Sequence, residues 1–202
     1  MASSPKPVLA VFDFDGTLTY HDSFVPFLKY AFGTTAFTRK MIGLFLPSLA
    51  HLSGRISRDQ LKEKLIAHFL TGVSEVWLNK KAQAFCDQRW EKLLRPSGLK
   101  GVAAEITAGH EVTLCSASPE LVLRPFAAKL NIKLIATQLE VINGYLTGAL
   151  IGINCRCASK VQRLQVVYGD LDQYHLRAWG DSAGDKQLLA AAQEPHWCYF
   201  HN

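Results

Sequence analysis

A short apolar segment near the N-terminus constrains the fold of this 202-residue chain more than any other feature of its sequence. The segment runs from Val8 to Phe14, is interrupted only by Asp13, and ends at the turn signal Asp15-Gly16. An apolar run that does not alternate with polar residues is typical of a strand that is buried on both faces. Such strands occur in parallel sheets, so the segment predicts an α/β protein with a parallel sheet at its centre.

The predicted elements divide the chain into a helical insert and a frame of alternating helices and strands. Residues 22–95 have a helical pattern, with a capping box formed by Ser57 and Gln60. From residue 96 onward helices alternate with strands, which favours right-handed βαβ units. We therefore expect a Rossmann-like parallel sheet core formed by residues 1–19 and 96–202, and an all-helical cap formed by residues 20–95.

The second part of the chain contains most of the expected strands. The sequence predicts helices at 99–108, 159–168 and 186–192, and strands at 111–115, 132–137, 176–179 and 197–200. A small hairpin is expected, with strands at 140–145 and 150–153 on either side of Leu146-Thr147-Gly148. Ser118 is expected to cap the helix that begins with Pro119.

Charge and composition narrow the classes of function. Hydrophobic residues make up 49% of the chain and charged residues 19%, which is ordinary for a folded soluble protein. Residues 20–95 carry 12 basic and 6 acidic side chains, whereas the rest of the chain is close to neutral. The basic insert indicates either an anionic ligand or ordinary solvated helix faces. The sequence has no zinc-finger spacing and no aromatic signature of RNA-binding domains, so we predict no nucleic-acid partner.

Cysteine usage and the N-terminal sequence bear on the cellular compartment. The five cysteines are scattered and odd in number, so no disulfide framework is expected. Cys155 and Cys157 lack a second pair and make a poor zinc site. Asp13 and Asp15 break the first apolar run with charge, which excludes a signal peptide there. We therefore predict a cytoplasmic protein.

Four polar pieces of the sequence stand just past the carboxyl ends of predicted strands or beside them. Parallel sheets build their sites at these ends, so we expect the pieces to meet in one site. The four pieces are Asp13-Phe14-Asp15-Gly16-Thr17-Leu18-Thr19, Cys115-Ser116-Ala117-Ser118, Lys160, and Gly180-Asp181-Ser182-Ala183-Gly184-Asp185.

The residue types in these pieces suit acid–base and metal chemistry. Asp13 and Asp15 are two residues apart at the end of an extended strand, so they point the same way and can address one reacting centre, while Gly16 permits the turn that exposes them. Neighbouring carboxylates repel each other, so a cation is expected between them. Asp181 and Asp185 add oxygen ligands of the kind that Mg²⁺ prefers. The alternative is that these acids cap helices, Asp185 above all.

In order and spacing, the four pieces resemble the four motifs of the haloacid dehalogenase superfamily over essentially the whole chain. The first piece, with the pattern D-x-D-G-T-L-T after an apolar strand, is the most specific. The resemblance implies that Asp13 is a nucleophile that forms an aspartyl-phosphate, and that Asp15 is the general acid and then the general base. It also implies that Ser116, Lys160 and Gly16 bind the phosphate group.

The resemblance further implies a bound Mg²⁺. Its ligands would be the carboxylate of Asp13, the backbone carbonyl of Asp15 and the carboxylate of Asp181, with Asp185 as a ligand or a nearby group. Ion-pumping members of the superfamily have Thr at the position of Asp15, and the dehalogenases lack this second Asp, so the acid favours hydrolysis of the phosphorylated intermediate. The implied activity is a Mg²⁺-dependent phosphomonoester phosphatase.

The position of the insert narrows the resemblance to subfamily IB, the group similar to phosphoserine phosphatases. In that group an acidic residue seven positions after the second Asp contacts the substrate amine, and Asp22 stands at that distance. Asp22 could equally cap the helix expected at 23–32, which is the interpretation we favour. Arg55, Arg58 and Lys62 are cations of the cap that no motif fixes, and among them Arg58 is our candidate substrate contact. We predict a small phosphorylated metabolite as the substrate, and phosphoserine is disfavoured because Gly16 stands where those phosphatases usually have Ser.

The apolar segment 41–52 leaves other functions open. It contains Pro47, follows Arg39-Lys40, and is shorter than the ~20 apolar residues that a membrane-spanning helix needs. The segment resembles the cap of phosphatidylglycerophosphatase C, another IB member, which implies a lipid-phosphate substrate and a membrane surface as partner. We favour the alternative that these residues form the small core of the cap. A phosphotransferase and a non-catalytic phosphate-binding regulatory protein also stay open, and the sequence indicates no oligomeric state.

Overall fold

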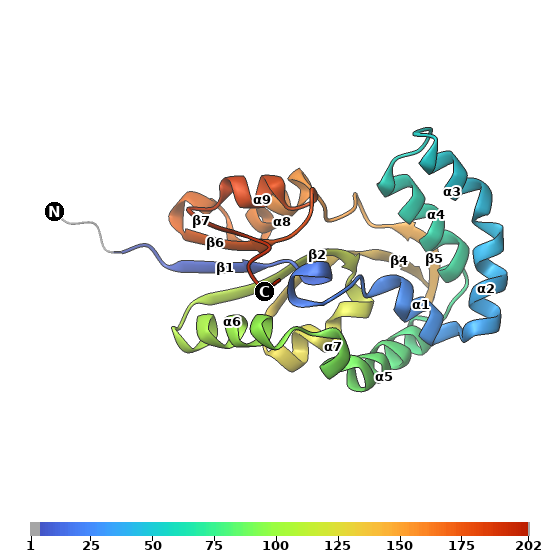
Figure 1. Ribbon diagram of the computed structural model, residues 1–202, viewed down its shortest axis with the longest axis horizontal. Coiled ribbons are helices and arrows are strands. Elements are labelled where there is room, and N and C mark those ends of the chain that lie inside the picture. The colour runs from blue at the N-terminus through green and yellow to red at the C-terminus, as the bar shows by residue number, and fades with distance from the viewer. Residues whose placement is uncertain (1–4, 202) are drawn as a thin grey trace.

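The computed structural model of the chain describes residues 5–201 and has an α/β fold (Figure 1). Its strands run parallel in one five-stranded sheet with the order β3-β2-β1-β6-β7, so β1 lies at the centre. The predicted parallel-sheet core is therefore confirmed. The strands are β1 (Val8–Phe12), β2 (Glu111–Pro119), β3 (Lys133–Thr137), β6 (His175–Gly180) and β7 (Glu194–Trp197).

β1 is buried on both faces, as its apolar sequence predicts. Leu9, Ala10, Val11 and Phe12 are fully buried. Because side chains alternate along a strand, Ala10 and Phe12 join the apolar cluster on one face of the sheet, and Leu9 and Val11 join the cluster on the other. The strand is also paired along both edges, so its carboxyl end is held firmly at the middle of the sheet.

Four helices cover the two faces of the sheet (Figure 1). α6 (Pro96–Thr107) and α7 (Glu120–Leu130) lie on one face, and α8 (Ala158–Tyr168) and α9 (Lys186–Ala191) lie on the other. A short 3₁₀-helix, η2 (Leu171–Gln173), leads into β6.

A short π-helical turn, η1 (Phe14–Leu18), and five α-helices lie between β1 and α6 in the described part of the chain. α2, α3 and α4 stand beyond the carboxyl ends of the strands, and α5 lies beside α7 (Figure 1). The predicted capping box is present at the start of α4, where Gln60 N donates to Ser57 Oγ and Ser57 N donates to Gln60 Oε1. Phe85 of α5 meets Phe126 of α7 with ring centroids 6.3 Å apart, so the insert shares apolar packing with the sheet helices. The five helices are α1 (Phe24–Phe32), α2 (Thr34–Gly43), α3 (Phe45–Leu52), α4 (Arg58–Leu70) and α5 (Glu75–Leu93).

An antiparallel hairpin, β4 (Leu139–Ile142) and β5 (Tyr145–Leu150), joins the helical insert to the rest of the molecule. Gly72 N donates to Leu146 O at 2.8 Å, and Leu146 N donates to Val73 O at 2.9 Å. The hairpin therefore binds the segment between α4 and α5, although it belongs to the second half of the chain.

Two predicted strand elements are wrong in position. The hairpin turns at Asn143-Gly144 and not at Leu146-Thr147-Gly148, because Asn143 and Gly144 adopt the positive φ angles, 52° and 80°, that a tight two-residue turn requires. The last strand is β7 and not residues 197–200. Its Pro195 is tolerated because β7 is an edge strand.

Two predicted helix starts also differ from the structure. α6 begins at Pro96 and not at residue 99, because proline suits the first position of a helix. Ser118 does not cap α7, since β2 continues through Ser118 to Pro119 and α7 starts at Glu120. The Ser118 side chain instead contacts Asp15.

Candidate active site

Asp13 occupies the first position after β1, at the carboxyl edge of the sheet. Its backbone N–H donates to Trp179 O at 2.9 Å, which ties it to β6. Its carboxylate is nearly buried and accepts a hydrogen bond from Lys160 Nζ at 2.6 Å. β1 thus places the Asp13 carboxylate at the carboxyl edge of the sheet, where parallel sheets present reactive groups.

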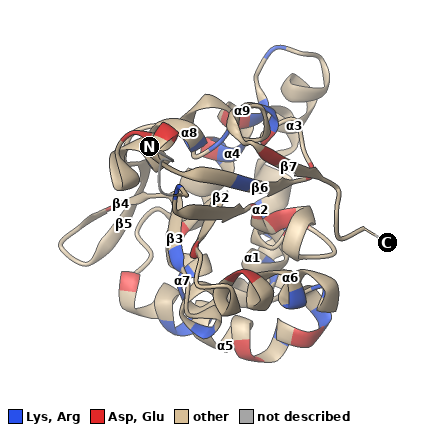
Figure 2. Cartoon of the chain, turned by 90° about the vertical axis from the view of Figure 1, so that its left-hand side faces the viewer, with Lys and Arg blue, Asp and Glu red and all other residues tan. Residues whose placement is uncertain are grey.

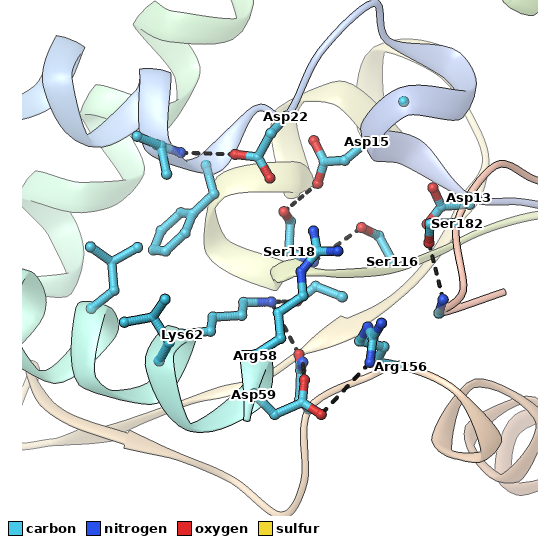
Figure 3. Close-up of a pocket in the computed structure, with 18 of the residues that line it drawn as sticks. Asp13, Asp15, Asp22, Arg58, Asp59, Lys62, Ser116, Ser118, Arg156 and Ser182 are labelled. Atoms are coloured by element: carbon cyan, nitrogen blue, oxygen red, sulfur yellow. Dashed lines mark hydrogen bonds and ion pairs between the residues drawn. The ribbon is translucent and has the colours of Figure 1, made fainter. Parts of the chain in front are cut away.

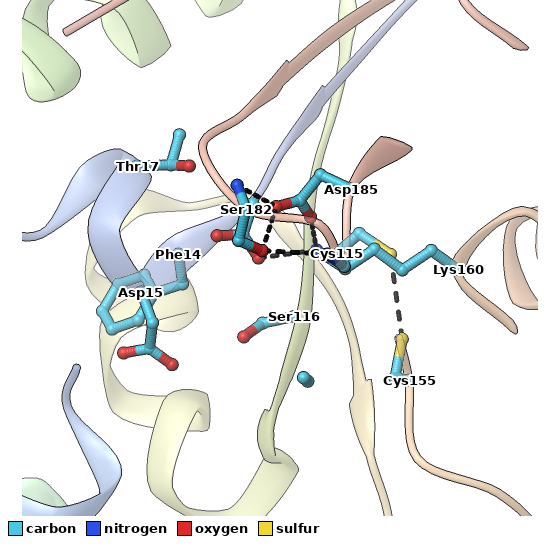
Figure 4. Close-up of polar contacts among 12 residues, drawn as sticks. Phe14, Asp15, Thr17, Cys115, Ser116, Cys155, Lys160, Ser182 and Asp185 are labelled. Carbon is cyan, nitrogen blue, oxygen red and sulfur yellow. Dashed lines mark hydrogen bonds and ion pairs between the residues drawn. The ribbon is translucent and has the colours of Figure 1, made fainter. Parts of the chain in front are cut away.

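Lys160 of α8 bridges two carboxylates (Figure 4). Its Nζ lies 2.6 Å from Asp13 Oδ1 and 2.6 Å from Asp185 Oδ1, and the side chain is 1% exposed. Burial alone would lower the pKa of Lys160, but Asp13 and Asp185 outweigh it and hold the pKa above its ordinary range. Lys160 is therefore a fixed positive charge on the floor of the site.

Asp185 is held by the loop that follows β6. Its Oδ2 accepts hydrogen bonds from Ser182 N at 3.0 Å and from Ser182 Oγ at 2.8 Å (Figure 4). Burial raises the pKa of Asp185, but Lys160 and Ser182 outweigh burial and keep this pKa below its usual value. Although Asp185 precedes α9, its side chain makes no capping hydrogen bond to that helix within the described residues. Its carboxylate belongs to the site rather than to the helix end.

Asp181 completes a group of three carboxylates. One oxygen atom from each of Asp13, Asp181 and Asp185 lies within 4.8 Å of the others. Asp181 Oδ1 accepts a hydrogen bond from Thr17 Oγ1 at 3.3 Å. Gly16 makes room for this acid, since a Cβ atom there would lie 2.1 Å from Asp181 Oδ2, and its φ of +87° favours glycine.

The charges in this group favour a cation. Burial raises the pKa of Asp13 to about 7, with Asp185 adding to the shift and Lys160 opposing it. Burial and the charge of Asp185 likewise raise the pKa of Asp181. One lysine faces three carboxylates, so negative charge is in excess. Carboxylate oxygens are the ligands that hard divalent cations prefer, and the residues present therefore fit a metal site.

Asp15 lies on the same cavity but is held by different partners (Figure 3). Its Oδ1 accepts a hydrogen bond from Ser23 N at 2.7 Å, and its Oδ2 accepts one from Ser118 Oγ. Burial and the charge of Asp22 raise the pKa of Asp15, and the two hydrogen bonds only partly offset this rise. A raised pKa favours the protonated carboxyl, which is the form that donates a proton.

Ser116 lies in the carboxyl-terminal half of β2, and its side chain is buried. Ser116 Oγ accepts a hydrogen bond from Ser118 N at 3.1 Å, so its own O–H can still donate. Ser116, Gly16 and Lys160 all line the cavity that contains the carboxylates. The three residues predicted to bind phosphate therefore line the same cavity as the carboxylates.

The cavity has a volume of about 630 Å³ and lies between the sheet edge and the helical insert. This size is within the range of ~300–1,000 Å³ that is usual for small-molecule sites. Its floor is charged, whereas apolar side chains of α1 to α4 form much of the opposite wall. These apolar residues are Phe24, Val25, Met41, Leu44, Leu61 and Leu65.

Lys62 of α4, a cation of the insert that no sequence motif fixes, also lines this cavity (Figure 3). Its Nζ donates to Ala117 O and to Asn154 Oδ1, the latter at 3.0 Å. Burial lowers the pKa of Lys62 to about 8, although Asp15 and other nearby acids oppose the shift. The sequence feature that indicates Lys62 is helical spacing. Lys62 stands four residues after Arg58, and both residues lie on the face of α4 that lines the cavity.

Asn154 extends this contact between α4 and the sheet edge. Its Nδ2 donates to Asp59 Oδ1 at 2.6 Å, and its Oδ1 accepts from both Lys62 and Thr137. Two polar residues of α4 are therefore anchored to one asparagine of the core.

The two candidate substrate residues, Asp22 and Arg58, both line the cavity. The N-cap position of α1 is Ser23 and not Asp22, but Asp22 Oδ1 accepts a hydrogen bond from Val25 N in the first turn at 3.1 Å, and Asp22 also lines the cavity. Arg58 is exposed at the first position of α4.

The chain was compared with known proteins. The family model of the haloacid dehalogenase-like hydrolases matches residues 10–190. Protein CicA of Caulobacter vibrioides is 36% identical over 197 residues, which cover 96% of this chain and 87% of CicA.

Solved structures share the fold. A protein of unknown function from Bordetella pertussis Tohama I has a TM-score of 0.76 at 24% identity, with 92% of this chain and 87% of that chain covered. A phosphoserine phosphatase with an analogue of a phospho-aspartyl intermediate has a TM-score of 0.61 at 18% identity, with 93% and 84% covered. At these identities the likeness concerns the fold alone.

Proposed function

The chain belongs to the haloacid dehalogenase-like hydrolases, and from this premise we propose that it is a Mg²⁺-dependent phosphatase that hydrolyses the phosphomonoester of a small metabolite. The observation that carries the proposal is the cluster of buried Asp13, Lys160 and Asp185 with half-buried Asp181 on the floor of the cavity. A non-catalytic phosphate-binding protein would not need a buried carboxylate beside the phosphate site, because that carboxylate repels the ligand.

Asp13 is the proposed nucleophile. One of its carboxylate oxygens attacks phosphorus, so an O–P bond to Asp13 forms while the bond to the leaving alcohol oxygen breaks. Asp15 donates its proton to that oxygen and then accepts a proton from the water that cleaves the aspartyl-phosphate. The raised pKa of Asp15 and its hydrogen bonds from Ser118 and Ser23 support this role. The phospho-aspartyl analogue in the similar phosphoserine phosphatase agrees with such an intermediate.

The phosphate group would be held from three sides. The Ser116 hydroxyl would donate a hydrogen bond to a phosphoryl oxygen, and Lys160 would neutralise the negative charge of the phosphate. Gly16, whose own N–H donates to Thr19 Oγ1 at 3.0 Å, would lie beside the phosphate as a residue without a side chain. Asp13, the backbone carbonyl of Asp15, Asp181 and Asp185 form the proposed Mg²⁺ site. Bound Mg²⁺ supplies positive charge that stabilises the transferring phosphoryl group.

We also propose that residues 20–95 act as a cap that selects the substrate over a core of residues 1–19 and 96–202. Lys62, Asp22 and Arg58 line the cap side of the cavity and would contact the leaving group. Because Lys62 is cationic near neutral pH, a leaving group that carries a further negative charge is favoured. The five cysteines are unpaired, which supports the proposed cytoplasmic location.

A lipid phosphate is the second candidate substrate, and the apolar cap side of the cavity favours it. The wall formed by Met41, Leu44 and Leu65 could accommodate an acyl or glycerol portion of such a molecule.

Phosphate release from a panel of phosphomonoesters tests the proposal. The panel contains phosphoserine, sugar phosphates, nucleotides and phosphatidylglycerophosphate in micelles, each with Mg²⁺ and with EDTA. We expect release that requires Mg²⁺ and is restored when Mg²⁺ is added back after EDTA. The preferred compound distinguishes the metabolite from the lipid. Binding of phosphomonoesters without any release would contradict a phosphatase, and release that persists in EDTA would contradict the metal site.

A further inference from the structure

Two neighbouring helices of the insert, α2 and α3, expose large apolar side chains to solvent. We call these side chains the apolar face; they are Ile42, Phe45, Leu46, Leu49 and Leu52, with exposed fractions between 45% and 82%. Single exposed apolar residues are ordinary on soluble proteins, but a contiguous group marks an interaction surface. The helices lie at the outer edge of the molecule, at the end opposite to the start of β1 (Figure 1).

The apolar face follows helical spacing. Its residues succeed one another at intervals of three, one, three and three positions, so they lie on one side of α2 and α3 despite the break at Leu44. Met41, Leu44 and Ser48 lie on the opposite side and line the cavity. The inner side of these helices thus has its packing partners within the chain, whereas the outer side meets solvent.

The chain segment that carries the apolar face contains charges of only one sign. Residues 34–58 contain Arg39, Lys40, Arg55 and Arg58 and no acidic residue. Arg39 and Arg55 are exposed, one near each end of the apolar face. Other helices differ, since lysines and arginines alternate with acids along α5 (Figure 2). The exposed Val76 of α5, for example, directly follows Glu75.

We propose that the apolar face docks this protein on the surface of an anionic lipid bilayer. Exposed aliphatic and aromatic side chains flanked by cations, without acids, are the combination that partitions into the interface of anionic membranes. None of the described helices meets the length and hydropathy of a membrane span, so the contact is peripheral.

Docking in this orientation would place the cavity directly behind the membrane-facing helices, because α2 and α3 contribute to both. The proposal concerns binding alone and goes beyond the proposed phosphatase activity. A binding experiment without substrate can therefore fail or succeed independently of catalysis.

Vesicle sedimentation tests the proposal with the full chain. The vesicles contain either phosphatidylcholine alone or phosphatidylcholine with phosphatidylglycerol at a 7:3 ratio, a composition chosen to present roughly the negative surface of cellular membranes. We expect the wild type to bind the anionic vesicles at least ~10-fold more strongly than the neutral ones. The double substitution Phe45→Ser/Leu46→Ser should reduce binding at least ~10-fold, since it removes inserted apolar area.

Two matched control pairs separate the apolar face from generic effects. Val76→Ser/Val166→Ser removes two exposed apolar side chains elsewhere and should leave binding unchanged. Arg39→Gln/Arg55→Gln should weaken binding to the anionic vesicles about 10-fold. Lys80→Gln/Arg89→Gln removes the same charge from α5 and should have an effect at least about threefold smaller.

Three results would overturn the proposal. The wild type could fail to sediment with either vesicle, or Phe45→Ser/Leu46→Ser could bind as well as the wild type. A concentration-dependent dimer in light scattering that this variant abolishes, without vesicle binding, would assign the apolar face to a second copy of the chain. Far-UV circular dichroism of each variant verifies that loss of binding does not reflect unfolding.

Discussion

The floor of the cavity and the apolar face on the outer side of α2 and α3 have opposite physical properties. On the floor, Asp13, Lys160 and Asp185 are almost completely buried, and hydrogen bonds of 2.6 Å fix their positions. Neither α2 nor α3 contains a fully buried residue, and their outer side is apolar and solvent-exposed. One region is built around charge that is removed from water, and the other around apolar surface that is left in water.

This difference assigns separate tasks to the two regions. Phosphoryl transfer requires groups that are held in place before the substrate arrives, and burial among paired charges provides that order. An exposed apolar surface contributes little to folding and is therefore free to meet a partner. Substitutions on the floor should therefore change the rate of phosphate release, whereas substitutions on the apolar face should change binding to membranes.

The largest expected effect comes from the proposed nucleophile, Asp13. Asp13→Asn is nearly isosteric but cannot form the aspartyl-phosphate, so phosphate release should fall by more than ~10³-fold. Circular dichroism and thermal unfolding should report a folded protein. Asp172→Asn, which neutralises an exposed acid in η2, is the matched control and should retain full activity. Metal-dependent turnover by Asp13→Asn would reject the nucleophile assignment.

Gly16 provides a second way to disturb the floor without removing a charged group. In Gly16→Ala the new methyl group would displace the Asp181 carboxylate, which lies 2.1 Å from the Cβ position, and turnover should fall ~10²-fold with weaker Mg²⁺ activation.

Gly169→Ala is the control for Gly16→Ala because Gly169 also has a positive φ, 76°, but no atom lies within 4 Å of its Cβ position. Both variants should lose about 1–2 kcal/mol of stability from the backbone alone. Equal loss of activity in the two variants would show that backbone strain, and not Asp181, explains the effect.

Part of the floor was accessible to sequence reasoning because the topology of the sheet places Asp13 and Asp181, whereas Lys160 of α8 was indicated only by the resemblance to the family. Once β1 is identified as a buried parallel strand, Asp13 must stand at the carboxyl edge, and Asp181 follows β6 next to it for the same reason. The hairpin turn could also have been found, since Asn143-Gly144 is the strongest short signal for such a turn.

Lys62 and the extent of the apolar face could not be found in the same way. The position of Lys62 depends on how α4 lies across the sheet edge, which the contacts of Asn154 with Asp59 and Lys62 decide. The sequence pattern of residues 41–52 is compatible with a buried cap core or an exposed surface, and the interpretation favoured from the sequence was burial. In the structure Leu44 is buried, but Phe45 and Leu46 are 63% and 74% exposed. The core prediction is therefore wrong for the outer half of the segment.

Lys62 lies on the cap side of the cavity, and the pH dependence of activity tests its role there. Because burial lowers its pKa to about 8, Lys62 is charged below that pH and neutral above it. For a substrate with a negatively charged leaving group, kcat/KM should fall about 10-fold between pH 7 and pH 9 as the lysine loses its proton.

Lys62→Arg keeps the positive charge throughout this range, so its kcat/KM should not share the decline. Lys62→Met should be ~10-fold less active at pH 7 and insensitive to the same change. The effect should appear in KM rather than kcat, since Lys62 contacts the leaving group and not phosphorus. A decline that persists in Lys62→Arg would assign the titration to another group.

The smallest expected effect is the change in stability when an exposed leucine of the apolar face is replaced. This effect tests the contrast between the exposed and the buried region most directly. Leu46→Ala should change the free energy of unfolding by less than ~0.5 kcal/mol, because the side chain is already in water. Leu28→Ala in α1 removes the same atoms from a fully buried position and should cost about 2–5 kcal/mol. Urea unfolding of both variants at low protein concentration measures the two values under one condition. A loss for Leu46→Ala as large as that for Leu28→Ala would mean that this leucine is covered in solution, which would remove the apolar face as a free surface and with it the contrast between the two regions.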